Sequence, residues 1–233
     1  GMVGVMFGEF ATEVPALQAI GTVLWGIDIA LFLFFAAMLS GRLLCFSTSR
    51  RELLDDPIQS LFLGAIPICL ATIVNGCILF GPHLFGPGAN EAAYIGWCID
   101  GILAALCSVF IPYQMFSRQA LSLDRMSPLW LLPVVPCEAA AASAGWLAPS
   151  LDRGAQQILV VGGTILWGLS VPIALAILCV FGLRLALHKL PPKELGASGW
   201  LTVGPLGAGA FGILLLGSDV AGASAGTPLA ALG

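Results

Sequence analysis

The sequence has 233 residues, of which 58% are apolar and only 9% are charged, and its net charge is −4. Soluble domains carry about 25% charged residues. This composition therefore excludes an ordinary soluble globular protein, which would have nowhere to bury so many apolar side chains. Most of the few charges fall between the apolar segments, and no nucleic-acid partner is expected.

Seven apolar segments follow one another along the chain, and the first of them is only partial. Their approximate bounds are 2–10, 15–44, 57–80, 93–116, 128–148, 156–187 and 197–217. An apolar helix of about 20 residues crosses a hydrocarbon core of about 30 Å. Residues 1–217 therefore predict one all-α polytopic membrane domain. Residues 218–233 are interpreted as a loop or as the start of a further helix, and Gly1 and Met2 as a cloning scar or an internal start.

The basic residues fall almost entirely on one side of this pattern. Eight of the nine lie at the ends of the second, fourth and sixth segments or in the connections that follow: Arg42, Arg50, Arg51, Arg118, Arg125, Arg184, Lys189 and Lys193. Lys and Arg collect in short cytoplasmic loops. We therefore predict a multi-pass protein of the plasma (inner) membrane whose loops near Arg50, Arg118 and Lys189 are cytoplasmic. The loops around His83 and Asp152 are then expected on the outer side.

The odd-numbered segments carry prolines and glycines, whereas the even-numbered segments are more continuously apolar. A proline inside a helix removes one hydrogen bond and kinks the helix. In a membrane, the freed backbone groups are tolerated only against protein or a water-filled cavity. We therefore predict helical hairpins in which kinked odd helices form an inner, pore-lining ring and even helices lie outside. Close packing through small residues is the alternative explanation of the glycines.

Candidate pore-lining residues lie on the odd-numbered segments. No Lys or Arg lies in the middle of a segment, so an anion path would depend on helix dipoles, freed amides and hydroxyl groups, which bind an ion without trapping it. The hydroxyl and amide side chains in the set could equally join packed helices. The candidates are Gly64, Pro67, Thr72, Asn75, Pro133, Pro136, Glu138, Ser143, Thr202, Gly204, Pro205, Gly207 and Phe211.

Three acidic residues are predicted inside the membrane. Glu138 lies about ten residues into its segment, which at 1.5 Å per residue is near the bilayer centre. Intramembrane acids are costly and are candidates for function. Glu138 is therefore either a group that exchanges protons or a neutral acid bonded to backbone freed by Pro133 or Pro136. For Asp28 and Asp100, on even-numbered segments, interhelical hydrogen bonds are expected.

The tryptophans and cysteines predict structure rather than chemistry. An interfacial aromatic belt is predicted to comprise Trp97, Trp130, Trp146 and Trp200. Trp25 and Trp167 lie deeper and are expected to pack between helices. The seven cysteines show no CxxC or Cys/His spacing and are interpreted as small buried hydrophobes. With no nucleophile elbow, metal-ligand spacing or phosphate loop, we predict no enzyme activity, metal site or cofactor.

Four stretches carry a resemblance to a known family: SLFLGAIPICLATIVNG (60–76), WLLPVVPCEAAAASAG (130–145), LPP (190–192) and TVGPLGAGAFGI (202–213). In this order they resemble the tellurite-resistance/dicarboxylate transporter (TDT) family, which includes fungal sulfite efflux pumps, malate permeases and plant slow-type anion channels. The fungal-type sulfite efflux branch is the most similar. The resemblance implies ten helices in five hairpins around a pore, and a homotrimer.

The resemblance also implies that this chain corresponds to about seven of those ten helices and is truncated at both ends. The family's pore-occluding phenylalanine lies on the ninth helix, so no residue here, Phe211 included, is given that role.

Three functions are compatible with these patterns. The first is export of sulfite or a similar small anion across the plasma membrane, favoured by the resemblance and by the lack of intramembrane cations. The second is a proton-coupled carrier of C4-dicarboxylates such as malate, which Glu138 favours. The third, of another class, is a membrane enzyme or assembly subunit. It would need polar catalytic groups clustered at one interface, and the sequence shows no such cluster.

Overall fold

The chain folds into helices joined by short turns. The computed structural model describes residues 2–9, 15–46, 52–119, 122–188 and 193–225, and within these ranges it contains no β-strand. The α-helices are α1 (Met2–Glu9), α2 (Pro15–Cys45), α4 (Ala65–Phe85), α5 (Gly88–Arg118), α6 (Val135–Leu147), α7 (Arg153–His188) and α8 (Val203–Ala225). The 3-10 helices are η2 (Ser60–Gly64), η3 (Leu123–Arg125), η4 (Pro128–Leu131), η5 (Ala148–Ser150) and η6 (Lys193–Thr202). The predicted all-α class is confirmed.

Five helical segments among the described residues are long and apolar enough to cross a membrane. They are Ala16–Cys45, Ser60–Phe85, Gly88–Arg118, Arg153–His188 and Ser198–Val220. The shortest has 23 residues, which at 1.5 Å per residue is about 35 Å and exceeds the hydrocarbon core. Large apolar side chains such as Phe34, Phe35 and Met38 of α2 are exposed, as a lipid-facing helix requires. The chain is a multi-pass membrane protein.

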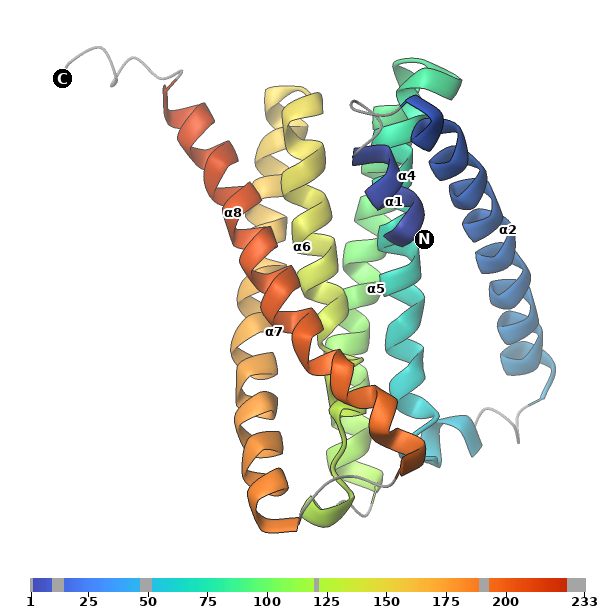
Figure 1. Ribbon diagram of the computed structural model, residues 1–233, viewed down its shortest axis with the longest axis vertical. Coiled ribbons are helices and arrows are strands. Elements are labelled where there is room, and N and C mark those ends of the chain that lie inside the picture. Colours follow the sequence, from blue (N-terminus) through green and yellow to red (C-terminus); the bar gives the residue numbers. More distant parts are fainter. Residues whose placement is uncertain (1, 10–14, 47–51, 120–121, 189–192, 226–233) are drawn as a thin grey trace.

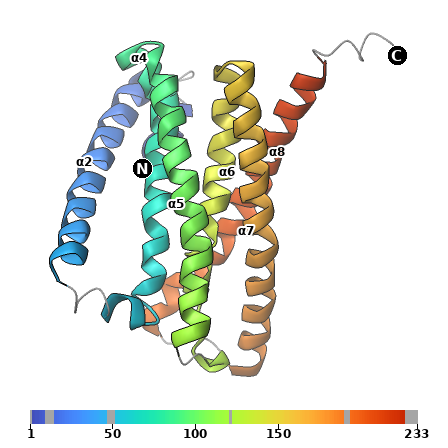
Figure 2. The same ribbon diagram turned by 180° about the vertical axis from the view of Figure 1, so that it is seen from behind.

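The helices lie in two layers (Figures 1 and 2). Helices α1, α4, α6 and α8 form one layer, and Figure 2, seen from behind, brings α5 and α7 to the front. Contacts agree with this view: α1 packs on α4, α4 on α6 and α6 on α8, while α5 packs on α4 and α6, and α7 on α6 and α8. Helix α2 packs on α1 and α4 at one edge. The helices of the odd-numbered segments therefore lie together in one layer, here called the inner layer (α1, α4, α6 and α8), and those of the even-numbered segments (α2, α5 and α7) are called the outer helices.

Helix α6 is the centre of the fold and contacts α4, α5, α7 and α8. Its sequence, VPCEAAAASAGWL, consists mostly of small residues, and nearly all are buried. A Cβ added at Gly145 would lie 2.7 Å from Leu215 Cβ of α8, and one at Gly163 of α7 would lie 2.8 Å from Ala144 Cβ. Such distances are too short for real side chains. Small residues are therefore needed for α6 to approach α7 and α8, which agrees with the alternative explanation of the glycines by close helix packing.

The predicted kinks are replaced by junctions between 3-10 and α-helix. Pro67, Pro136 and Pro205 lie in the first turns of α4, α6 and α8, and these helices are preceded by η2, η4 and η6. Proline is tolerated in a first helical turn because its missing N–H would have no intrahelical partner there. The 3-10 helix passes directly into the α-helix before Pro67 and Pro205, and through the turn at residues 132–134 before Pro136. These prolines mark where the inner α-helices begin.

Two outer helices also contain prolines, so helix breakers are not confined to the inner layer. Pro112 lies inside α5 and Pro172 inside α7. A further inner-layer proline, Pro82, lies inside α4.

Two smaller expectations also change. Trp97 is only 5% exposed and lies in the main hydrophobic cluster, so it does not belong to an interfacial belt. Helix α8 continues to Ala225, beyond the predicted limit of the last segment, so Asp219 is a buried side chain on a helix rather than a loop residue.

Candidate functional site

The junction between η4 and α6 is held by a serine from each of two outer helices. Residues 132–134 form a turn there. Ser108 Oγ of α5 lies 2.8 Å from the carbonyl oxygen of Pro133, and Ser170 Oγ of α7 lies 2.7 Å from that of Val134. Both serines are buried. Backbone carbonyls outside regular helix are thereby satisfied, as they must be at membrane depth.

The junction also depends on a close backbone approach from η2. Pro136 has no N–H, so the carbonyl of Leu132 receives no helical hydrogen bond from it. This carbonyl lies directly against Gly64: an added Cβ would be 2.7 Å from the carbonyl carbon of Leu132 and 2.9 Å from Pro133 Cα. Only glycine leaves room for the two backbones, so Gly64 fixes how η2 and α4 meet the start of α6.

The same two serines also contact side chains of α6. Ser108 Oγ is 3.1 Å from Cys137 Sγ, and either atom could be the donor. Ser170 Oγ donates to Glu138 Oε1 at 3.2 Å as well as to the Val134 carbonyl. Since a hydroxyl has one hydrogen to donate, Ser170 shares it between the junction and the Glu138 carboxyl group.

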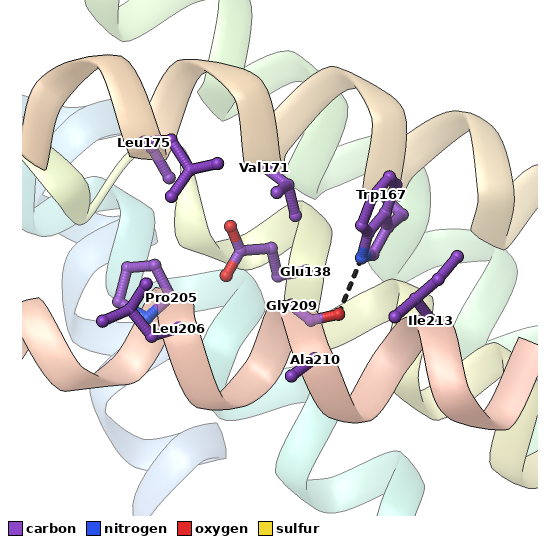
Figure 3. A pocket seen from close by; sticks show the side chains of 10 residues that line it. Glu138, Trp167, Val171, Leu175, Pro205, Leu206, Gly209, Ala210 and Ile213 are labelled. Carbon is purple, nitrogen blue, oxygen red and sulfur yellow. Dashed lines mark hydrogen bonds between the residues drawn. The ribbon is translucent and has the colours of Figure 1, made fainter.

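The Glu138 side chain reaches a cavity of about 130 Å³ between α7 and α8 (Figure 3). Its Oε2 is buried and has no hydrogen-bond partner among the described residues. The indole N–H of Trp167 donates to the carbonyl of Gly209 across the same cavity, at 2.7 Å. The other lining residues are apolar: Val171, Ala174, Leu175, Pro205, Leu206, Ala210 and Ile213. One carboxyl oxygen thus faces an apolar space with room for a small anion or a few water molecules.

No Lys or Arg is among the described residues that line this cavity. Arg118 ends α5, Arg153 begins α7, and Arg42 and Arg184 lie near the ends of α2 and α7. Arg184 is buried, and its Nη2 donates to the carbonyl of Asp124 at 2.9 Å, which ties α7 to η3. An anion in the cavity would meet apolar side chains, the Glu138 carboxyl group and an indole N–H that is already bonded.

The predicted hydroxyl and amide candidates lie apart from Glu138. Thr72 Oγ1 is 3.1 Å from Asp28 Oδ2, so this pair links α4 to α2 as an interhelical hydrogen bond. Ser143 donates to the carbonyl of Ala139 and Thr202 to that of Gly199, both within their own segments. The Oδ1 atom of Asn75 is buried without a hydrogen-bond partner among the described residues. These hydroxyl hydrogens are used within the protein.

Of the remaining candidates, only Pro205 joins Glu138 at the cavity. Gly64, Pro133 and Pro136 belong to the junction, and Pro67 is buried in the first turn of α4. The other three lie exposed on α8: Gly204, Gly207 and Phe211. The structure therefore divides the predicted set into the junction, the cavity and the surface of α8.

Several functional candidates did not emerge from the sequence. Ser108 and Ser170 each lie shortly before a proline in an apolar outer helix, at Pro112 and Pro172, and that spacing was their only signal. The residues around Asp219 are small and weakly apolar and do not predict a site, yet Asp219 is buried and its Oδ2 has no hydrogen-bond partner among the described residues. Asp100, expected to form an interhelical bond, is fully buried with neither oxygen bonded to a described residue.

Comparison with known proteins gives one family over almost the whole chain. Residues 1–232 match the SLAC1 profile, described as voltage-dependent anion channel. The sulfite efflux pump SSU1 of Arthroderma otae is 32% identical over 218 residues, which cover 93% of this chain and 58% of that protein. SSU1 of Trichophyton rubrum is 31% identical with the same coverage.

A more distant relative is named for a different anion. The malic acid transport protein of Schizosaccharomyces pombe is 21% identical over 205 residues, covering 88% of this chain and 47% of that protein. The chain thus spans 58% of the length of the two sulfite efflux pumps that it matches.

Proposed function

We propose that this chain, which belongs to the SLAC1 family of voltage-dependent anion channels, forms part of the path by which a small anion crosses a membrane. Sulfite is the first candidate, because the relatives at 31% and 32% identity are named sulfite efflux pumps. One structural observation carries the proposal: Glu138, fully buried, presents an oxygen with no hydrogen-bond partner among the described residues to a cavity between α7 and α8.

The proposed path uses weak, uncharged groups. When Glu138 is protonated it does not repel an approaching anion, and its carboxyl hydrogen can be offered from Oε2, the oxygen that no described residue contacts. Since no lysine or arginine is among the described residues that line the cavity, the anion is not held tightly, and conduction requires binding weak enough for release. Glu138 would in this way pass a proton to or from the anion while the apolar walls exclude bulk water.

A second candidate is proton-coupled transport of a C4-dicarboxylate. The relationship to a malic acid transport protein favours it, and so does the same carboxyl group, since a proton carried with the substrate requires a titrating side chain inside the membrane. Sulfite is smaller than malate, so the 130 Å³ cavity would hold sulfite with more freedom.

We also propose the setting of the protein. The loops near Arg50, Arg118 and Lys189 would face the cytoplasm at the plasma membrane, as the distribution of basic residues favours. The outward faces of α2, α5 and α7 are rich in large apolar side chains, which suits both lipid and neighbouring subunits. A homotrimer, with one path in each subunit, is the proposed assembly.

Anion flux into proteoliposomes tests this function. Because the chain spans 58% of the length of its relatives, flux is measured for this chain and for a protein of the relatives' length that contains it. Sulfite, malate and chloride are compared under an imposed proton gradient. We expect sulfite to pass fastest. Malate uptake that depends on the gradient, with no sulfite flux, would favour the second candidate, and no flux of any anion would refute the proposal.

A further inference from the structure

Three outer-layer helices carry the same short pattern, a tryptophan followed three residues later by Asp or Ser. The copies are WGID (Trp25 to Asp28) in α2, WCID (Trp97 to Asp100) in α5 and WGLS (Trp167 to Ser170) in α7. Residues three apart lie on the same face of a helix, so in each copy the two side chains face the inner layer together. The copies recur at nearly equal spacing and mark an internal repeat.

In every copy the indole N–H donates to a backbone carbonyl of the next inner helix. Nε1 of Trp25 lies 3.1 Å from Ile73 O of α4, that of Trp97 lies 2.7 Å from Ala140 O of α6, and that of Trp167 lies 2.7 Å from Gly209 O of α8. The bonded residues are 48, 43 and 42 positions apart in the chain. One long-range bond is thus made three times, and we call it the tryptophan latch.

The accepting helices are shaped for the indole ring. Three residues after each accepting carbonyl stands a small residue: Gly76 in α4, Ser143 in α6 and Gly212 in α8. A Cβ added at Gly76 would lie 2.8 Å from Trp25 Cγ, and one at Gly212 would lie 3.6 Å from Trp167 Cδ1. The carbonyl and the small residue share one helix face, and at Gly76 only glycine leaves room for the Trp25 ring, whereas at Gly212 the contact with Trp167 is an ordinary one.

The polar member of the pattern has a bonded partner in two copies. Asp28 accepts from Thr72 of α4, and Ser170 lies within hydrogen-bond distance of Val134 O and Glu138 of α6. The outer helix is therefore tied to the inner layer at two points one turn apart. In α7 these two points are the Gly209 carbonyl and the Glu138 carboxyl, on either side of the cavity.

The third latch forms a wall of this cavity. Trp167 and Gly209 both line it, and a Cβ at Gly209 would lie 3.9 Å from the carboxyl carbon of Glu138. Figure 3 shows the Gly209 carbonyl directed at the indole nitrogen rather than at the carboxyl group. The latch thereby fixes the position of Gly209, and with it of this part of α8, beside the Glu138 carboxyl group.

Resting on the proposed function, we propose that Trp167 is a positioning residue for anion passage, acting through the Gly209 carbonyl. The Gly209 carbonyl keeps its hydrogen bond within α8, but without the indole N–H the latch would no longer hold α8 to α7 at the cavity. Gly209 would then shift relative to the Glu138 carboxyl group and change the space that the anion meets. Trp167→Phe should lower anion flux roughly threefold to tenfold, the range that one interhelical hydrogen bond in a membrane represents. It should also shift the pH dependence of flux.

The test compares three variants in proteoliposomes, using the protein that transports in the assay above. Trp167→Phe removes the latch at the cavity, Trp25→Phe removes a latch remote from it, and Trp200→Phe changes a ring that is 80% exposed. Only Trp167→Phe should shift the pH profile. Trp167→His, which keeps a ring N–H, should recover part of the flux, and it remains informative if the phenylalanine variant does not fold.

Hydrogen exchange of the indole N–H groups gives a readout independent of transport. The N–H of Trp167 should exchange far more slowly than that of Trp200. Equal exchange rates, or a Trp167→Phe protein with wild-type flux and pH profile, would overturn the positioning role while the proposed function stands. Wild-type protein with no anion flux would instead refute the proposed function, and the positioning role with it.

Discussion

Replacing Gly64 by alanine should strongly destabilise the protein, because the new methyl group would meet backbone rather than a mobile side chain. The added Cβ would lie 2.7 Å from the Leu132 carbonyl carbon and 2.9 Å from Pro133 Cα. Ordinary contacts begin near 3.4 Å, so η2 and the start of α6 must separate by several tenths of an ångström or more. Overpacking of this kind costs about 1–3 kcal/mol. We expect about 3 kcal/mol at this site, because neither backbone can rotate out of the way.

Thermal unfolding in detergent measures this effect. Cys137 is fully buried on α6, so its reaction with a thiol reagent reports opening of the junction in a chain whose other cysteines are alanine. Gly26→Ala is the matched control: its Cβ would meet nothing within 4 Å, and it should be neutral or slightly stabilising. If Gly64→Ala unfolds at the same temperature as Gly26→Ala, the close approach at the junction is not a constraint and the reasoning fails.

Two further predictions concern residues in the loops and near the helix ends. The pKa of the Asp56 carboxyl is held below its usual value by the backbone N–H groups of Gln59 and Ile58, each 2.8 Å away. A lowered pKa stabilises the folded state above the ordinary value near 4, so Asp56→Ala should reduce thermal stability at pH 7, and the difference from wild type should vanish as the pH falls below 4. In a cysteine-free background, an impermeant thiol reagent applied outside should label His83→Cys and spare Arg50→Cys. Labelling at position 50, which lies outside the described residues, would invert the topology.

Much of the fold could be predicted because its signals are local. Length and apolar character predicted the segments at 15–44 and 156–187, and the observed helices are Pro15–Cys45 and Arg153–His188. The 3-10 segments could not be foreseen, since a proline in a first helical turn and a proline at a kink look alike in sequence. The end of α8 was missed for a related reason: small, weakly apolar residues form loops unless a neighbouring helix can pack on them.

The candidate site was harder to predict because it depends on how helices face one another. Glu138 could be identified from its charge in an apolar segment. Ser108 and Ser170 become meaningful only once the junction shows which carbonyls need donors, and that requires the rotation of α5 and α7 about their axes. The tryptophan latch could not be predicted either. Trp25 and Trp167 were expected to pack between helices, but an indole donor can be assigned a hydrogen bond only when its carbonyl acceptor is known.

The central claim is that Glu138 exchanges a proton with the anion that passes its cavity. Glu138→Gln keeps the shape of the side chain and can still bond Ser170, but it cannot titrate. Sulfite flux into proteoliposomes, measured over a range of pH for the wild-type and Glu138→Gln proteins, tests the claim directly. The account predicts that the variant folds and transports with a flattened pH dependence. Unchanged flux with an unchanged pH profile would contradict it and would leave Glu138 as a structural hydrogen-bonding group.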